Sequence, residues 1–247
     1  MKTWSGFTYD FHGACDLILV KSQNFHKGTG VEIQIRTEIR RDWSFIASTA
    51  IKIGGDILEV GGHAKYAINR EQGAELTESV QELAKIGGFP VQYFRYGTRR
   101  HKFEINIGDK QKIHVKIYNE FLSVGVDDAE AEDFGDATGM MGHFHSGKLL
   151  SRGGEEVADY KQFGFEWQVR NTEEEPMLFT EGQFPQFPTQ CKMPSPKATS
   201  RRLRRRLSEG VSYEEAAKAC ENWVYEARES CIYDVMSTGD LKMAEWN

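Results

Sequence analysis

The sequence has little proline, few cysteines and no long apolar run. Only 6 of its 247 residues are proline and 4 are cysteine, too few cysteines for a small scaffold that depends on disulfides alone. No stretch approaches the roughly 18 consecutive apolar residues of a membrane-spanning helix, so we expect no membrane insertion by this segment. The net charge of −6 argues against a nucleic-acid partner, because phosphate contacts require a basic surface.

Several functional motifs are also missing. The chain has no Gly-x-Ser-x-Gly elbow, phosphate-binding loop, dinucleotide fingerprint or His-Glu-x-x-His pair, so the commonest catalytic motifs do not apply. The cysteines form no Cys-x-x-Cys pair of a zinc site, and residues 1–6 contain no apolar part of a signal peptide. We expect a non-enzyme, either cytosolic or an internal part of a longer secreted chain.

The first 130 or so residues alternate between apolar and polar side chains, which is typical of strands buried on one face. Glycine-containing turns at 54–56 and 108–110 separate such segments at short spacing. This pattern predicts a mainly β fold, an antiparallel β-sandwich or open barrel. Segment 73–85 fits either a short helix or a long loop. The alternating segments are 31–36, 50–53, 103–107, 113–117 and 163–169.

The C-terminal part differs in composition. Proline-containing segments at 184–188 and 194–196 predict an extended crossing and a domain boundary. Beyond it, Ser212 and Glu215 have the spacing of a capping box, at the start of an alanine-rich run that predicts helix to about Ala227. We therefore expect a small α-helical appendage over residues 197–247.

Four segments, in order, resemble the von Willebrand factor type D domain. The most specific is Tyr-Asp-Phe-His-Gly-Ala-Cys at 9–15, followed by an apolar strand. The other segments are 66–69, 139–144 and 163–169. The resemblance implies an all-β domain over residues 1–191, acting as a non-catalytic structural or interaction module of a secreted or cell-surface protein in matrix or adhesion. Its partners would be other extracellular proteins or glycans.

The resemblance also implies how the cysteines pair. Cys15 and Cys191 match a disulfide of the family, and Cys231 resembles a cysteine of its C-terminal extension, which leaves Cys220 to pair with Cys231. In one continuous helix the latter two would lie about 16 Å apart, whereas a disulfide needs Cα atoms within roughly 7 Å. The chain must therefore reverse between them, and we place the reversal near 228–230. The alternative is four reduced thiols.

The sequence departs from the family where many members bind calcium. Ser5, His143 and His145 stand at the matching positions, and Lys148 adds positive charge. Calcium prefers six to eight oxygen ligands, so we expect no cofactor at this loop. The acidic stretch 127–133 predicts a solvated loop, with loose calcium binding as the alternative. The disulfide that the family makes in this loop is also absent, because a methionine replaces its cysteine.

His143 and His145 give an alternative function. Two residues apart in a strand, their imidazoles would point the same way and could bind zinc or copper if a third ligand approached. His12, Asp127 or Glu132 are candidates for that ligand, and a metalloenzyme would then be conceivable. A further hypothesis, lipid or glycan binding between the sheets, requires a large apolar pocket.

The most charged segment lies at 201–206. We expect it to be a solvated helical face or linker. Its functional alternatives are docking on an acidic partner, such as the acidic stretch of this chain, or cleavage by a secretory convertase. The candidate interaction residues are Arg201, Arg202, Arg204, Arg205 and Arg206.

Overall fold

The computed structural model describes residues 1–40, 43–194, 211–223 and 225–245. It divides the chain into two compact units. Unit 1 comprises Met1–Arg40 and Ser44–Met193, and unit 2 comprises Arg41–Trp43 and Pro194–Asn247. The arginine run 201–206, our candidate interaction segment, lies outside the described residues.

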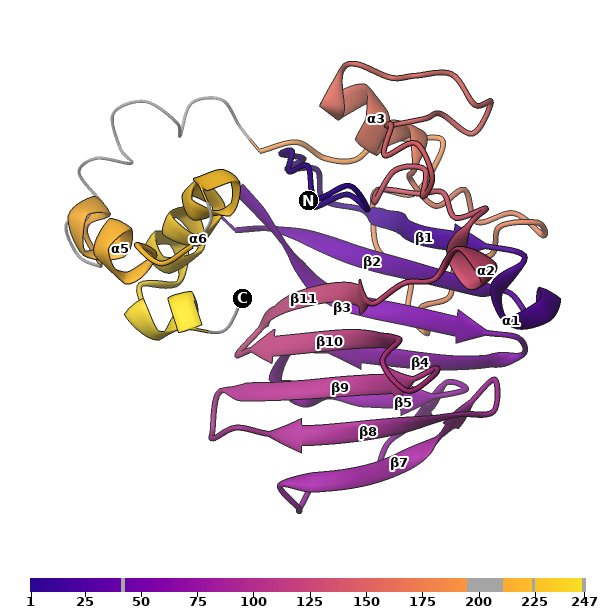
Figure 1. Cartoon of the computed structure of the whole chain (residues 1–247), viewed down its shortest axis with the longest axis horizontal. Coiled ribbons are helices and arrows are strands. Elements are labelled where there is room, and N and C mark those ends of the chain that lie inside the picture. Colours follow the sequence, from indigo (N-terminus) through magenta and orange to yellow (C-terminus); the bar gives the residue numbers. More distant parts are fainter. Residues whose placement is uncertain (41–42, 195–210, 224, 246–247) are drawn as a thin grey trace. The chain divides into compact units, whose positions relative to one another are not determined.

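Unit 1 is built on a single curled antiparallel sheet, a half-barrel, which confirms the predicted mainly β fold (Figure 1). The order along the sheet is β6-β5-β4-β3-β11-β10-β9-β8-β7, and β2 pairs with both β1 and β3. The strands are β1 (Asp16–Ser22), β2 (Val31–Arg40), β3 (Trp43–Ile53), β4 (Asp56–Gly61), β5 (Tyr66–Ile68), β6 (Glu71–Gln72), β7 (Val80–Ile86), β8 (Phe89–Arg95), β9 (Arg100–Asn106), β10 (Lys112–Tyr118) and β11 (Phe121–Asp127).

The alternation in the sequence predicted these strands because each buries one face. In β10, Ile113, Val115 and Ile117 are buried while the intervening residues are partly exposed. The predicted segments 31–36 and 50–53 lie inside β2 and β3. Segment 73–85 is neither the short helix nor the long loop that we predicted, because its second half forms β7.

The two sides of the half-barrel are joined at one end by Asp56. Its carboxylate accepts hydrogen bonds from the Gly87 backbone N–H, at 2.9 Å, and from the Asn69 amide, at 3.0 Å. Gly87 has φ +56°, and a Cβ there would lie 2.2 Å from a methyl carbon of Ile53, so the turn between β7 and β8 requires glycine. These bonds hold the β3–β4 turn against the β7–β8 turn.

The interior of the curled sheet is filled by side chains. Tyr66 on β5 packs against Phe103 on β9, with ring centroids 5.7 Å apart, so the facing sides of the sheet touch. A hollow apolar pocket between them, which lipid or glycan binding would require, does not fit this packed core. The largest fully buried side chains of the core are Tyr93, Phe25, Phe103, Phe134 and Phe163.

Residues 163–169 are not a strand, and that prediction is wrong. They lie in and after the helix α3 (Tyr160–Glu166), whose N-cap Asp159 accepts a hydrogen bond from the Gln162 backbone N–H at 2.8 Å. Phe163 and Trp167, four residues apart, are both buried, as expected for one face of a helix. The other short helices of unit 1 are α1 (Phe25–Gly28), α2 (Ala131–Phe134) and the 3-10 helix η1 (Gly62–Ala64).

The described part of unit 2 contains two α-helices, where the sequence predicted one. The capping box of Ser212 and Glu215 is present at the start of α5 (Tyr213–Ala219), as predicted. The chain leaves the helix at Cys220, and α6 (Tyr225–Thr238) follows, then the 3-10 helix η4 (Leu241–Glu245). The reversal that a Cys220–Cys231 bond requires therefore begins at 220–223, and not at 228–230, which lie within α6.

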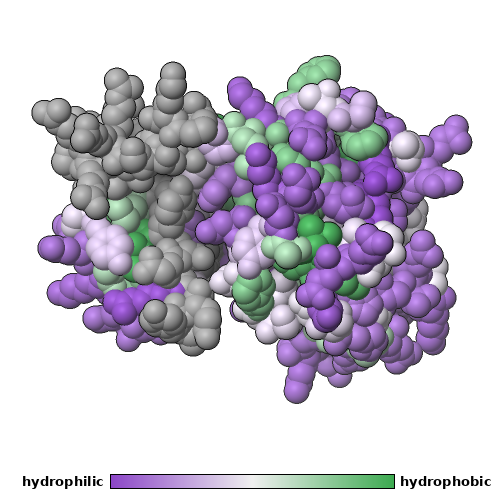
Figure 2. Space-filling view, turned by 90° about the horizontal axis from the view of Figure 1, so that it is seen from above, coloured by the Kyte–Doolittle hydropathy of each residue, from purple (hydrophilic) through white to green (hydrophobic). Residues whose placement is uncertain are grey.

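No helix among the described residues is long and apolar enough to cross a membrane. The face of unit 1 in Figure 2 is mostly hydrophilic, with small separate hydrophobic patches. Single exposed apolar residues are normal on such a surface. The most exposed of them is Phe184, at 86%.

Candidate functional site

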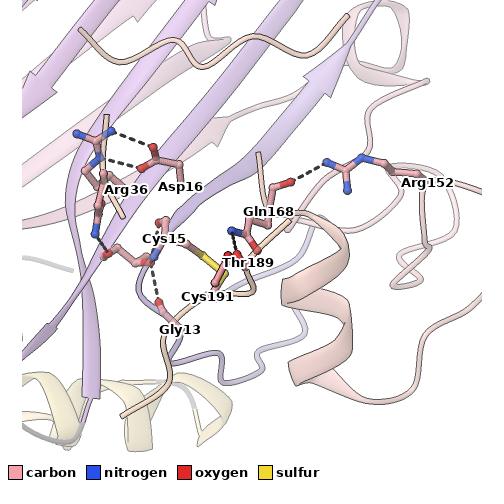
Figure 3. Close-up of a disulfide and its surroundings, with 10 residues drawn as sticks. Gly13, Cys15, Asp16, Arg36, Arg152, Gln168, Thr189 and Cys191 are labelled. Atoms are coloured by element: carbon pink, nitrogen blue, oxygen red, sulfur yellow. Dashed lines mark hydrogen bonds and ion pairs between the residues drawn. A yellow bond between two sulfur atoms is a disulfide. The ribbon is translucent and has the colours of Figure 1, made fainter. Parts of the chain in front are cut away.

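The first candidate site is the disulfide between Cys15 and Cys191, which joins residues 176 apart in the chain (Figure 3). Their Cα atoms lie 5.1 Å apart, and both side chains are buried. The backbones run together here, because Ala14 and Lys192 exchange two hydrogen bonds of 2.8 and 3.2 Å. This bond fixes the end of unit 1 to the start of β1, and it is the pairing that the family resemblance implies.

The segment before Cys15 is shaped to approach its partner closely. A Cβ on Gly13 would lie 2.9 Å from the Cβ of Cys191 and closer still to the ring of Phe11. The Gly13 carbonyl accepts a 2.7 Å hydrogen bond from the hydroxyl of Thr37 on β2. The glycine in the Gly-Ala-Cys motif is therefore required for packing around the disulfide.

A buried ion pair lies beside the disulfide. Arg36 on β2 binds both carboxylate oxygens of Asp16 on β1, at 2.7 and 2.9 Å, with the two side chains only 12% and 9% exposed. The same guanidinium donates a 2.7 Å hydrogen bond to the Glu181 carbonyl and lies 4.2 Å from the centre of the Phe179 ring. Arg36 thus holds the 179–181 segment against the first two strands.

A second arginine orders the chain after α3. Arg152 binds Glu175 at 2.8 Å and donates a 3.1 Å hydrogen bond to the Gln168 carbonyl. Its guanidinium lies 4.8 Å from the Trp167 ring. The Gln168 amide in turn donates a 2.9 Å hydrogen bond to the Thr189 carbonyl, two residues before Cys191. These polar side chains hold the crossing segment in place, as Figure 3 shows for Arg152, Gln168 and Thr189.

His143 and His145 lie in a loop and not in a strand, so their side chains do not share one strand face. Their ring centroids are 6.2 Å apart with an interplanar angle of 54°. The Nδ1 atom of His143 accepts a 3.3 Å hydrogen bond from the Ser146 backbone N–H. The loop does approach Ser5, whose side chain lies beside Gly147, as the resemblance implies.

The described residues supply no third metal ligand beside this histidine pair. No group of three or more His, Cys, Asp or Glu side chains in the described part of the chain could hold a metal ion. Asp127, one proposed third ligand, instead binds His114 on β10 at 2.9 Å. The metal hypothesis for His143 and His145 therefore gains no support from the geometry.

The acidic stretch and the residues just after it have a structural role. Asp136 accepts hydrogen bonds from the Ser22 hydroxyl and from the backbone N–H groups of Gln23 and Asn24, the latter two at 2.8 and 3.1 Å. Asp133 accepts a 2.9 Å hydrogen bond from the His26 backbone N–H. These two carboxylates thus fix the loop after β11 to the turn after β1, where we expected a solvated loop.

The hydrogen bonds to Asp136 make stability depend on pH. Burial raises the pKa of this carboxyl, but the bonds from Ser22, Gln23 and Asn24 together hold it below its ordinary value of 3.8. Because the folded pKa is depressed, the stabilisation is complete above the unfolded pKa and is lost as the pH falls through the folded one.

We expect Asp136→Asn to lower the free energy of unfolding at pH 7 by about 1.5 kcal/mol, as for one lost hydrogen bond to a charged group. The deficit relative to the wild type should shrink at pH values below 3.8, because the wild-type carboxyl then becomes protonated too. Urea unfolding at pH 7 and pH 3 measures both values, with the exposed Asp109→Asn as the matched control. An equal deficit at both pH values would show that the carboxylate charge does not matter.

A second candidate site opens at one end of the half-barrel. It is a pocket of about 530 Å³, and no sequence pattern predicts it because its residues come from three separate segments. The lining residues are His63, Arg95, Gly97, Thr98, His101 and Asn119.

His101 forms part of the buried wall of this pocket. Its Nδ1 lies 2.7 Å from the Tyr93 hydroxyl. Burial and the nearby positive charge of Arg95 lower the pKa of His101, against a smaller opposing effect of the Thr98 backbone. The Arg95 side chain also donates a 3.3 Å hydrogen bond to the Tyr93 hydroxyl, so Tyr93 holds both basic side chains in place.

Comparison with known proteins adds no assignment. No protein-family model matches the chain, and no curated protein matches it. The resemblance to von Willebrand factor type D domains therefore stays a prediction from the sequence motifs.

Proposed function

We propose that this chain is a non-catalytic structural or interaction module of a secreted or cell-surface protein, of the von Willebrand type D class. The observation that carries the proposal is the Cys15–Cys191 disulfide. It joins residues 176 positions apart, and it is the pairing that the sequence resemblance implies.

The second disulfide supports the same compartment. Cys220 and Cys231 are bonded in unit 2, with Cα atoms 6.0 Å apart, and both are buried. No free cysteine remains among the described residues, and all 4 cysteines of the chain are used. Two disulfides of this kind are compatible with an oxidising environment, since reduced thiols prevail in the cytosol.

The polar groups near the first disulfide support a structural role. Arg36, Asp16, Arg152 and Gln168 are engaged by other parts of unit 1. They immobilise the crossing segment and give the half-barrel a rigid frame. A rigid frame lowers the entropic cost of binding a partner, which suits a module that presents a fixed surface.

The proposal predicts that the module is retained by extracellular matrix. We would secrete the chain from cultured animal cells behind a cleavable signal peptide and measure the fractions in the medium and in the washed matrix. The comparison variant is Cys15→Ala/Cys191→Ala, whose unit 1 is expected to be marginally stable or unfolded, so it shows whether retention depends on the fold. We expect several-fold more wild type than variant in the matrix per molecule secreted. Complete recovery of folded, oxidised wild type from the medium would contradict an interaction role.

A further inference from the structure

The pocket at the end of the half-barrel contains the positive charge of Arg95 and the imidazoles of His63 and His101. Arg95 on β8 and His101 on β9 are direct cross-strand partners, so their side chains leave the sheet on the same face. That face carries the buried Tyr93 below them. His63 and Asn119 complete the pocket from η1 and the β10–β11 turn, and the His63 backbone N–H donates a 2.7 Å hydrogen bond to the Asn119 carbonyl.

No acidic side chain lines this pocket among the described residues. The neighbouring Glu120 is ion-paired with Arg40, which reduces its effect on the local charge. The chain as a whole has a net charge of −6, so the sign of the charge in this pocket is opposite to that of the whole molecule. Such a local excess of positive charge favours an anionic ligand.

The exposed Arg95 side chain makes two hydrogen bonds within unit 1. Its Nε donates to the Tyr93 hydroxyl, and one Nη donates to the Leu76 carbonyl. Three of the five guanidinium N–H groups remain without an acceptor among the described residues. A guanidinium with unused N–H groups can bind two oxygens of an oxyanion at once.

The backbone around the pocket is held in an uncommon conformation. His63 and Asn119 both have φ +55°, and Gly97 has φ +119°. Asparagine and histidine adopt left-handed backbone more readily than most residues, and Asn119 does so in the two-residue turn between β10 and β11. Both residues line the same opening as Arg95.

We propose that this pocket binds the sulfate or phosphate ester group of a saccharide-sized ligand, with Arg95 and His63 as the principal contacts. A volume of about 530 Å³ exceeds what a lone oxyanion fills and falls in the range of small-molecule sites. The Asn119 amide supplies a neutral donor for the ring hydroxyls or the ester oxygens. This inference deepens the proposed function, on which its extracellular context rests, by naming the ligand class.

The test is an NMR titration of ¹⁵N-labelled protein whose disulfides have been verified. The ligands are glucosamine 6-sulfate, glucose 6-phosphate, inorganic sulfate and the uncharged N-acetylglucosamine. We expect saturable shifts at His63, Gly97, Thr98, His101 and Asn119 with at least one of the esters and none with the uncharged sugar. Which ester binds more tightly distinguishes a sulfated glycan from a phosphorylated ligand.

Variants separate the pocket from general charge attraction. Arg95→Gln and His63→Gln should each weaken ester binding about tenfold, the effect of losing one hydrogen bond to a charged group. The exposed Lys85→Gln on β7, which removes the same charge elsewhere, should leave it unchanged. Absence of saturable binding, binding no tighter than that of inorganic sulfate, or equal weakening by all three variants would overturn the proposal. The protein used in the titration already has both disulfides, so a failure to bind would contradict the ligand proposal and leave the module assignment unaffected. Free cysteines in the purified protein would contradict the module assignment and say nothing about the ligand.

Discussion

Removing the Cys15–Cys191 disulfide is expected to lower the free energy of unfolding of unit 1 by about 5 kcal/mol. The chain-entropy treatment gives this value for a closed loop as long as the 176-residue separation of these cysteines. A typical domain is stable by only about 5–15 kcal/mol, so the loss should leave unit 1 marginally stable or unfolded. Cys15→Ala/Cys191→Ala is the variant to use, because alanine leaves no buried hydroxyl without a partner.

Urea unfolding followed by tryptophan fluorescence and far-UV circular dichroism measures this loss. The matched control is Cys220→Ala/Cys231→Ala, which opens a separation of only 11 residues and should cost about 3 kcal/mol by the same treatment. That cost should fall on unit 2. A loss below about 1 kcal/mol in the first variant would show that the disulfide does not constrain the unfolded chain of unit 1.

The second large effect concerns the buried ion pair beside that disulfide. Asp16→Ala should destabilise unit 1 by about 3–5 kcal/mol, because it leaves the Arg36 guanidinium buried without its counterion. The pair is 12% and 9% exposed, so solvent cannot replace the lost carboxylate. Thermal and urea unfolding of the oxidised protein would measure the change.

A double variant distinguishes the cost of an unpaired charge from the value of the pair. Asp16→Leu/Arg36→Met removes both charges at similar volume, and such replacements are often neutral or stabilising. We expect it to recover most of the stability that Asp16→Ala loses. If the double variant is instead as unstable as Asp16→Ala, the bonds of Arg36 to the 179–181 segment, rather than its charge balance, hold the structure.

Much of the sheet could be predicted from the sequence because one-sided burial imposes a period of two. Ile113, Val115 and Ile117 show this directly: all three are buried on the same face of β10. The order of the strands and the curl of the sheet could not be predicted. They depend on contacts such as that of Asp56 with Gly87, 31 residues apart, which leave no local pattern.

The misassigned segment 163–169 shows the limit of that pattern. Apolar residues at 163, 165, 167 and 169 alternate as in a strand, yet positions 163 and 167 also share one face of a helix. Two residues favour the helix over a strand here. Asp159 caps its N-terminus, and Gly164 packs against Phe11. The cap was visible in the sequence, but the contact with Phe11 was not.

The two candidate sites also differ in how far the sequence predicts them. The disulfide pairing followed from motifs that lie in one stretch of sequence each, at Cys15 and Cys231. The pocket combines His63, Arg95 and Asn119, which no sequence motif connects. Only the curl of the sheet brings them together.

The most direct test of the account is a peptide map by mass spectrometry, without reducing agent, of protein made through a secretory pathway. We expect the peptide containing Cys15 to be linked to that containing Cys191, and the peptide containing Cys220 to that containing Cys231. Four free thiols, or disulfides between any other pairs of these cysteines, would contradict the assignment of this chain as an extracellular module of the von Willebrand type D class.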